Sequence, residues 1–367
     1  MASLKHLPAG RQRLVEALTP YAVPDTRVGL RLFIVDVAVY AIGMGLALFE
    51  DGTVWRVVGA VIVGLKMGSV YTLAHDALHH SLTASRRLNK LIAATGYLLS
   101  LHNYRIRLFD HLVLGHHPKL NGSQPDVYQP MSWEAYQQAP WWRQAWERYV
   151  RSPQIFAFAP YGIVSRWLEA ELLPNKAMPA IFRARAYGYG LLLLGSLSLF
   201  VGWLAIRNDG DAAGLLSDIA LVLVLPFFIF QTLQAAILFF QHTHPSIPWF
   251  GPGDPQFGQW GPEALTVHVE LPKWLSSLTH EICEHPAHHV VPSIPCYRLR
   301  EAQAMLNELL GDRSLRVRPS YKVLADIMRR CKVYDYEHHV WLDFKGRPTA
   351  VPISEWSPPA SALPMPA

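Results

Sequence analysis

The sequence contains little cysteine and little charge. Three of its 367 residues are cysteine, and Asp, Glu, Lys and Arg together make up 17%. The cysteines are odd in number and include no C-x-x-C pair: Cys283, Cys296 and Cys331. This excludes a disulfide framework, an iron–sulfur cluster and a covalently attached haem, so we expect reduced thiols in a cytoplasmic setting. The sequence also lacks a dinucleotide-binding G-x-G-x-x-G loop.

The sequence has no nucleic-acid-binding pattern, and we expect no cleaved leader. The formal net charge is +5, but no basic run is interleaved with aromatic residues as in a nucleic-acid surface. The first 21 residues carry Lys5, Arg11 and Arg13 but no apolar core of signal-peptide length. A basic surface that faces a membrane explains the positive charge better than a nucleic-acid partner does.

Long apolar runs are abundant. Hydrophobic residues make up 51% of the chain, and four runs are long enough to cross a bilayer, at about residues 29–50, 54–74, 187–206 and 215–240. Asp36 interrupts the first run, and we expect it to lie near the membrane interface or to face the interior of a helix bundle. Lys66 is the only interior charge of the second run, since Arg56 lies close to its start. Pro226 should kink the fourth helix without ending it.

The charge distribution predicts the orientation. The turns at residues 50–53 and 207–211 are short and largely acidic, whereas Lys and Arg concentrate at the N-terminus, in residues 86–184 and after residue 272. By the positive-inside rule we expect a multi-pass protein of the bacterial inner membrane with both termini in the cytoplasm. The predicted fold is all-α, with four transmembrane helices in two hairpins and a cytoplasmic helical cap from residues 75–184 and 241–347. We expect a single domain over residues 1–347 and a disordered tail over residues 348–367, which are rich in Pro, Ala and Ser.

Histidine is the residue type that indicates chemistry. In the stretch His285-Pro-Ala-His288-His289, three imidazoles are spaced i, i+3 and i+4, which places them on one face of a helix. Other clusters follow the second run, occupy the polar segment after it and follow the fourth run, so all lie on one predicted side of the membrane. The predicted metal ligands are His75, His79, His80, His111, His116, His117, His242, His285, His288 and His289, with His244 and His280 as possible additions.

The number of imidazoles indicates two metal ions. A single ion cannot hold this many, since even zinc takes about four ligands. We expect iron, because imidazole suits it and a redox metal with an open position can activate oxygen. No Glu stands three residues before a His, so the Glu-x-x-His pairs of soluble di-iron bundles are absent. Asp76 is expected to support a ligand imidazole by a hydrogen bond.

The middle cluster is irregular. On a regular helix His111 would point about 140° away from His116. A π-bulge or a break near Gly115 could bring it back, and such bulges often occur at functional sites. We expect the remaining histidines to be structural or surface residues: His6, His102, His268, His338 and His339.

The boxes His75-Asp-Ala-Leu-His79-His80, a second one that ends in His116-His117, and His285-Pro-Ala-His288-His289 together resemble the signature of integral-membrane fatty acid desaturases. Gln241-His242-Thr243-His244-Pro245 and the Val-Val-Pro-Ser-Ile-Pro-Cys-Tyr after the third box are similar to the delta-12 (oleate-type) branch. The resemblance covers roughly residues 30–310. It departs from the family at the second box, where Leu112 and Val113 occupy the positions of the usual third histidine.

The resemblance implies four transmembrane helices, a cytoplasmic di-iron cap and a hydrophobic tunnel for an acyl chain. It implies an oxidoreductase that uses O2 as co-substrate and two external electrons to convert a C–C bond of an acyl chain into a C=C bond. The implied cofactor is two iron ions (Fe2+/Fe3+). The implied partners are membrane lipid, an acyl substrate carried on a phospholipid, acyl-CoA or acyl-carrier protein, and an electron donor such as ferredoxin or a cytochrome.

Other functions fit parts of the pattern. Related membrane enzymes hydroxylate alkyl chains, add keto groups or form acetylenic bonds, and the boxes do not distinguish these reactions. The first box is also His-x-x-x-His with an acid between, as in zinc metalloproteases, although that reading leaves the other clusters without a role. In a metal transporter the histidines would line a path across the bilayer, whereas the predicted spans contain almost none.

Overall fold

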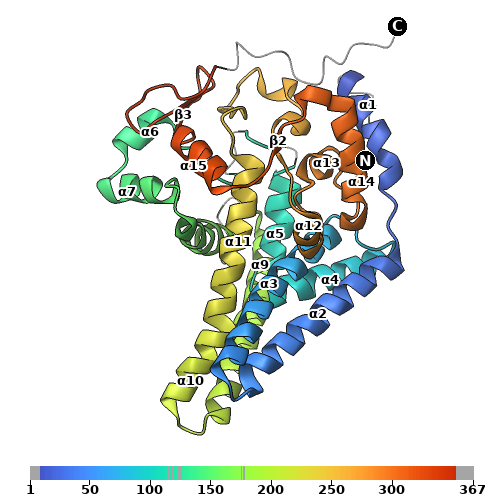
Figure 1. The fold of residues 1–367 in the computed structure, drawn as a ribbon, viewed down its shortest axis with the longest axis vertical. Helices are drawn as coiled ribbons and strands as arrows, with labels where there is room; N and C mark the ends of the chain where they lie inside the picture. The colour runs from blue at the N-terminus through green and yellow to red at the C-terminus, as the bar shows by residue number, and fades with distance from the viewer. Residues whose placement is uncertain are drawn as a thin grey trace. The chain divides into compact units, whose positions relative to one another are not determined.

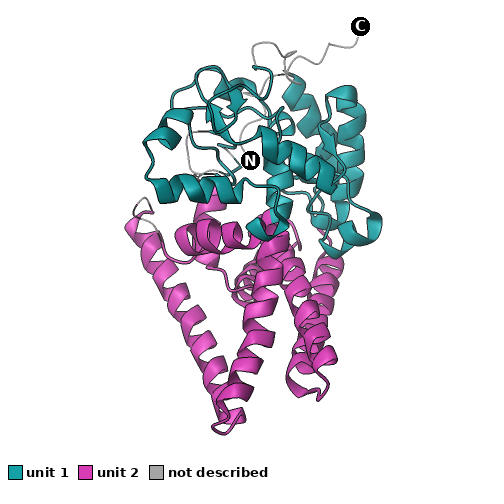
Figure 2. Cartoon of the chain, turned by 60° about the vertical axis from the view of Figure 1, so that its left-hand side comes forward, with its two compact units in different colours: residues 1–23, 114–157, 236–367 teal, residues 24–113, 158–235 magenta. Residues whose placement is uncertain are grey.

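A computed structural model describes residues 9–114, 116–117, 119–122, 126–174, 176 and 178–352, and these residues are mostly helical (Figure 1). The chain divides into two compact units (Figure 2). Unit 1 comprises residues 1–23, 114–157 and 236–367, and unit 2 comprises residues 24–113 and 158–235. The single domain expected over residues 1–347 stays a prediction. Most of the expected C-terminal tail lies outside the described residues.

The four predicted spans are confirmed as helices. They are α2 (Thr26–Phe49), α3 (Thr53–Leu78), α9 (Ala180–Arg207) and a continuous helix over Ala212–His242. Each is long and apolar enough to cross a membrane. The last consists of α10 (Ala212–Ile219), the π-helical η6 (Ala220–Val224) and α11 (Leu225–His242). Pro226 has no N–H to donate, and the change to π-helix lies in the turn before it, which explains how the helix continues past the proline.

The first hairpin of unit 2 is closely packed. A Cβ atom on Gly59 of α3 would lie 2.5 Å from the backbone nitrogen of Ala47 and 2.6 Å from the carbonyl oxygen of Gly43, both on α2, so only glycine permits this approach. Small residues at such crossings let membrane helices meet closely. Further along, Nζ of Lys66 lies 2.5 Å from Oδ1 of Asp36, which is 3% exposed. Asp36 therefore faces a helix of its own unit.

Removing Lys66 should destabilise this hairpin. The Lys66→Met variant would leave the buried Asp36 carboxylate without its lysine, at a cost of about 3–5 kcal/mol. The double variant Lys66→Met/Asp36→Leu replaces the pair by apolar residues and should recover most of that loss. Thermal unfolding in detergent measures both variants. A single variant as stable as the wild type, or a double variant no better than the single, would contradict a stabilising ion pair.

Shorter helices complete unit 2. They are α4 (Arg86–Leu99), which packs against α3, then α5 (Tyr104–Leu108) and the π-helical η3 (Phe109–Leu114), followed later by α8 (Phe158–Pro160) and the π-helical η5 (Tyr161–Glu171). α4 is a 14-residue helix with one buried face, and it is too short to cross a bilayer. The segments η3 and η5 each contribute a buried side chain to the polar interior of unit 2.

Unit 1 is a mixture of short helices and two small sheets. Its helices are α1 (Ala9–Leu18), η2 (Thr19–Tyr21), α6 (Trp133–Gln138), α7 (Trp141–Val150), η4 (Ile155–Ala157), η7 (Phe257–Gln259), η8 (Pro262–Ala264), α12 (Lys273–Leu278), α13 (His285–Val290), α14 (Cys296–Leu310), η9 (Gly311–Arg313) and α15 (Tyr321–Arg330). Strand β1 (His268–Val269) pairs in parallel with β2 (Arg316–Val317), and β3 (Val333–Asp335) pairs antiparallel with β4 (Val340–Leu342). α13 packs against η8, α14, β1 and α1, which surround it within unit 1.

Candidate metal centre

Four histidines of unit 1 converge from three separate segments. His116 follows η3, His242 is the last residue of α11, and His285 and His289 are one turn apart on α13. Nε2 of His285 lies 2.9 Å from Nε2 of His242 and 3.0 Å from Nε2 of His289. The potential ligand atoms of all four lie within 4.8 Å of one another. We call this group the quartet.

These distances suit a bound metal ion. Two nitrogen donors at right angles on an ion with bonds of about 2.1 Å lie about 3.0 Å apart, close to the spacing within the quartet. In a neutral imidazole, Nε2 either carries a hydrogen or offers a lone pair, but not both. Nε2 of His285 therefore cannot donate a hydrogen bond to one neighbouring Nε2 atom and accept one from the other. Burial and the neighbouring histidines hold the pKa of His289 well below its usual range. The ring is therefore neutral at neutral pH, which is the form that binds a metal.

Local sequence positions the quartet. The spacing of four between His285 and His289 places both rings on one face of α13, and Pro286 lies in the first turn, where a helix tolerates proline. The end of α11 is tied to the segment before α13 by Gln241, whose Nε2 donates to the carbonyl of Ile282 at 2.8 Å. His242 is thereby held near the helix that carries the other two ligands.

His117 and His288 lie beside the quartet within unit 1. Their ring centroids are 4.9 Å apart, and the centroid of His117 is 4.4 Å from that of His289. His288 is fully buried on α13. These two imidazoles are further candidate ligands beside the quartet, and their role as ligands stays a prediction.

Three histidines of unit 2 form a second group, which we call the trio. His75 lies in the last turn of α3, His79 caps that helix, and His111 lies in η3. Nε2 of His111 is 2.8 Å from Nε2 of His75 and 2.9 Å from Nε2 of His79. These are again the spacings that a bound ion requires. The sequence suggested a π-helical segment near His111, and η3 is such a segment. Within unit 2, however, it places His111 beside the histidines of the first box. His111 therefore belongs to the trio, whereas His116 of the second box belongs to the quartet.

Three other predicted ligands lie outside both groups among the residues that the structure describes. His80 is exposed and has a φ of 60°, so the backbone turns away as α3 ends. His244 accepts a hydrogen bond at Nδ1 from the backbone N–H of Ser246, and burial lowers its pKa to about 4. His280 has a φ of 49° in a turn after α12. Their ligand roles stay predictions without geometric support.

Asp76 is fully buried, as a supporting carboxylate would be, but its Oδ1 lies 3.7 Å from Nδ1 of His75. At this distance the pair is an electrostatic contact, and the hydrogen bond expected from Asp76 to a ligand imidazole stays a prediction. Sequence reasoning missed another carboxylate. Asp126 accepts a hydrogen bond from Nδ1 of His116 at 2.7 Å. Burial alone would raise the pKa of Asp126, but the His116 ring and the backbone N–H of Val127 lower it to about 2. Its position ten residues after His116 was the available signal.

A buried charge cluster in unit 2 was also missed. Glu171, at the end of η5, accepts from Nη1 of Arg107 and Nη2 of Arg166, both at 2.8 Å, and lies 3.2 Å from Nε2 of His102. Burial lowers the pKa of His102 to about 4, so this ring is neutral at neutral pH and not charged. Arg107 lies one turn before His111, so the cluster supports the helix that carries the central histidine of the trio.

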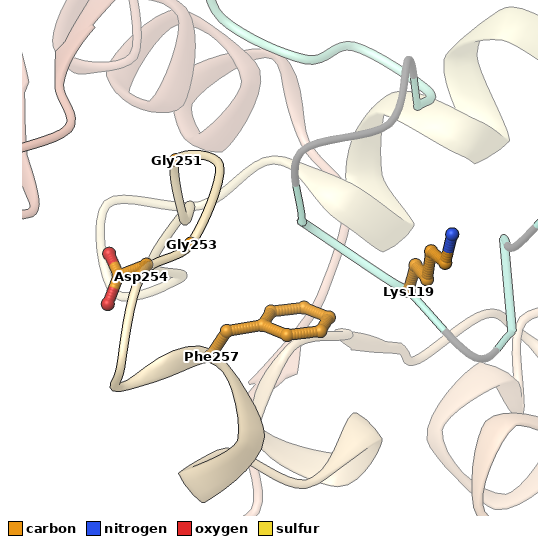
Figure 3. A pocket seen from close by; sticks show the side chains of 5 residues that line it. All are labelled: Lys119, Gly251, Gly253, Asp254 and Phe257. Carbon is orange, nitrogen blue, oxygen red and sulfur yellow. The ribbon is translucent and has the colours of Figure 1, made fainter.

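The residues that line the pocket in Figure 3 belong to neither histidine group. The pocket has a volume of about 110 Å³ and is lined by Lys119, Gly251, Gly253, Asp254 and Phe257 of unit 1. The carboxylate of Asp254 points away from Lys119, toward His339, whose Nε2 is 3.2 Å from Oδ2. The pocket is smaller than the roughly 300–1,000 Å³ of pockets that bind drug-sized ligands. It is not the acyl tunnel implied by the resemblance, and that tunnel stays a prediction.

Comparisons with known proteins agree with this chemistry. A family model described as fatty acid desaturase matches residues 53–321. The chain is 24% identical over 287 residues to an omega-6 fatty acid desaturase of spinach chloroplasts, covering 77% of this chain and 59% of the relative. It is 24% identical to an sn-1 oleoyl-lipid 12-desaturase of Picosynechococcus, covering 78% and 77%. It is 25% identical to an sn-1 acyl-lipid omega-3 desaturase (ferredoxin) of Synechocystis, covering 79% and 77%.

The chain thus spans about three fifths of the length of the chloroplast relative. The matched region runs from the start of α3 into α15 and contains every histidine of the quartet and the trio. The predicted resemblance is therefore confirmed at the level of the family. The chain belongs to the fatty acid desaturase family.

Proposed function

We propose that this protein is an O2-dependent fatty acyl desaturase that binds two iron ions, one at the quartet and one at the trio. The observation that carries the proposal is that two separate sets of histidines each converge through Nε2 atoms 2.8–3.0 Å apart. Imidazole-only donor sets suit iron, copper or zinc, and the family match favours iron. Bound iron would supply the redox chemistry by which oxygen removes two hydrogens from an acyl chain.

The residues of the chain hold and shield these ions. His285 and His111 are each the central member of a group, so they fix the spacing of the other donors. Five of the seven rings in the two groups are buried, namely His75, His111, His242, His285 and His289, and this burial would limit the access of water to a bound ion. His117 and His288 are the remaining candidate ligands.

We further propose a membrane acyl-lipid as substrate and a ferredoxin-type protein as electron donor. Relatives are named for oleoyl-lipid and acyl-lipid substrates, and one is named for ferredoxin. Acyl-CoA and acyl-carrier protein are the alternative carriers, and a cytochrome is the alternative donor. The short acidic turns and the basic remainder of the sequence support an inner-membrane protein with both termini in the cytoplasm.

Expression in a bacterium that lacks polyunsaturated lipids tests the function. Mass spectrometry of the fatty acids and of the intact lipids should show a new double bond in chains that are esterified to phospholipid. A variant with His285 and His111 both replaced by alanine is the matched control and should give the host profile. Hydroxylated or acetylenic chains without new alkenes would overturn desaturation in favour of the related reactions. One zinc per chain in place of two irons would favour a protease.

A further inference from the structure

Asp126 is a buried carboxylate that contacts a member of the quartet. Its Oδ1 lies 2.7 Å from Nδ1 of His116, and both side chains are largely shielded from solvent. An ionised carboxylate only accepts hydrogen bonds, so Nδ1 of His116 must carry the hydrogen that lies between the two groups. Nε2 is then the ring atom through which His116 can bind an ion. We propose that Asp126 is a positioning residue that fixes the tautomer and ring orientation of His116 for metal binding; this rests on the proposed function.

Asp126 is itself held in place from two sides. Oδ1 also accepts from the backbone N–H of Val127 at 2.7 Å, and Oδ2 accepts from the backbone N–H of Asn121 at 3.2 Å. Asn121 has a φ of 56° and is anchored in turn, because its Nδ2 donates to the carbonyl of Pro248 at 3.0 Å. The N–H of Phe250 donates back to the carbonyl of Asn121 at 2.9 Å. The carboxylate therefore cannot rotate freely.

This support connects two ligand segments within unit 1. Pro248 and Phe250 follow His242 by six and eight residues, and Asn121 follows His116 by five. The path from Pro248 through Asn121 and Asp126 to His116 thus links the loop after α11 to the loop that carries the second box. Both loops contribute a donor to the quartet.

The need for such support is greatest at His116. His285 and His289 are fixed by their spacing on α13, and His242 is part of α11. His116 lies in a turn outside any helix, so its backbone alone does not set the ring. Metal-binding imidazoles commonly donate their second N–H to a carboxylate, and loss of that partner typically costs about 10–100-fold in metal affinity.

Titration of the metal-free full-length protein with Co2+ in detergent micelles tests this inference. Visible absorption reports the geometry of the bound ion, and elemental analysis reports its stoichiometry. Asp126→Ala should weaken one of the two Co2+ sites by about 10–100-fold and alter its absorption, while the other site is unchanged. Asp126→Asn keeps an acceptor for His116 but loses the charge, so its affinity should fall between those of alanine and the wild type. The Asp126→Asn variant also tests the inference if the alanine variant does not fold.

Asp335→Asn is the matched control. Oδ2 of Asp335 accepts from Nδ1 of His338 at 2.8 Å, so the same kind of pair is altered at an exposed position of unit 1. This variant should bind both ions as the wild type does. Two unchanged sites in a folded Asp126 variant would overturn the positioning role while the proposed function stands. A wild type that binds no Co2+ at micromolar concentration would overturn the proposed di-metal function itself.

Discussion

Replacing His285 by alanine is expected to remove one of two bound irons and to lower desaturation by more than about 100-fold, because even supporting residues around a metal cost 10–100-fold when lost. His285 is the central donor of the quartet, with Nε2 atoms of His242 and His289 at 2.9 and 3.0 Å. The alanine variant therefore lacks the donor that contacts both His242 and His289. Iron content by elemental analysis and product formation by mass spectrometry measure the two effects.

His111→Ala should have the matching effect on the trio. Its Nε2 is 2.8 Å from His75 and 2.9 Å from His79, so its loss should also leave about one iron per chain. His80→Ala is the control, because His80 is exposed and lies outside both groups among the described residues. It should keep both irons. A His80 variant that loses iron would restore the ligand role that its sequence position predicts, and a His285 variant that retains two irons would contradict the quartet as a site.

Replacing Glu171 by alanine should destabilise the protein by about 3–5 kcal/mol, because two arginines would lose the carboxylate that compensates their buried charge. Glu171 is 2% exposed and accepts from Arg107 and Arg166. Thermal unfolding in detergent measures the loss. Glu171→Gln keeps an acceptor but not the charge, so it should fall between alanine and the wild type. Glu169→Ala removes an exposed glutamate of the same helix and should change little.

The same carboxylate gives a pH dependence with a defined sign. Burial alone would raise the pKa of Glu171, but Arg107 and Arg166 hold it below the ordinary value of 4.5. A depressed pKa contributes stability that is fully present above the unfolded value and is lost as the pH falls through the folded value. The wild type and the Glu171→Gln variant should therefore differ most above pH 4.5 and converge on acidification below it. A difference in stability that grows on acidification would contradict this role.

The secondary structure and the residue types of the site were predictable from the sequence. The four long helices follow from apolar runs, and each run specifies its own helix through local hydrogen bonds. The shared face of His285 and His289 follows from their spacing alone. The sequence indicated that Asp36 could face the interior of the bundle, but it did not identify Lys66 as its partner. The register of the two helices is set by packing such as that of Gly43 against Gly59.

The division of the histidines and the residues that support them were decided only by the tertiary structure. His111 belongs to a group with His75 and His79 and lies in the π-helix η3, whose altered turn changes the direction of the ring; the sequence suggested such a bulge but expected it to bring His111 toward His116. Asp126 and Glu171 act through contacts with residues 10 and 64 positions away. The sequence by itself determined which residues can bind metal, because that is a property of each side chain. Packing between distant segments decides which of these residues lie close together, because the spacing of residues along the chain does not give their distances in the fold.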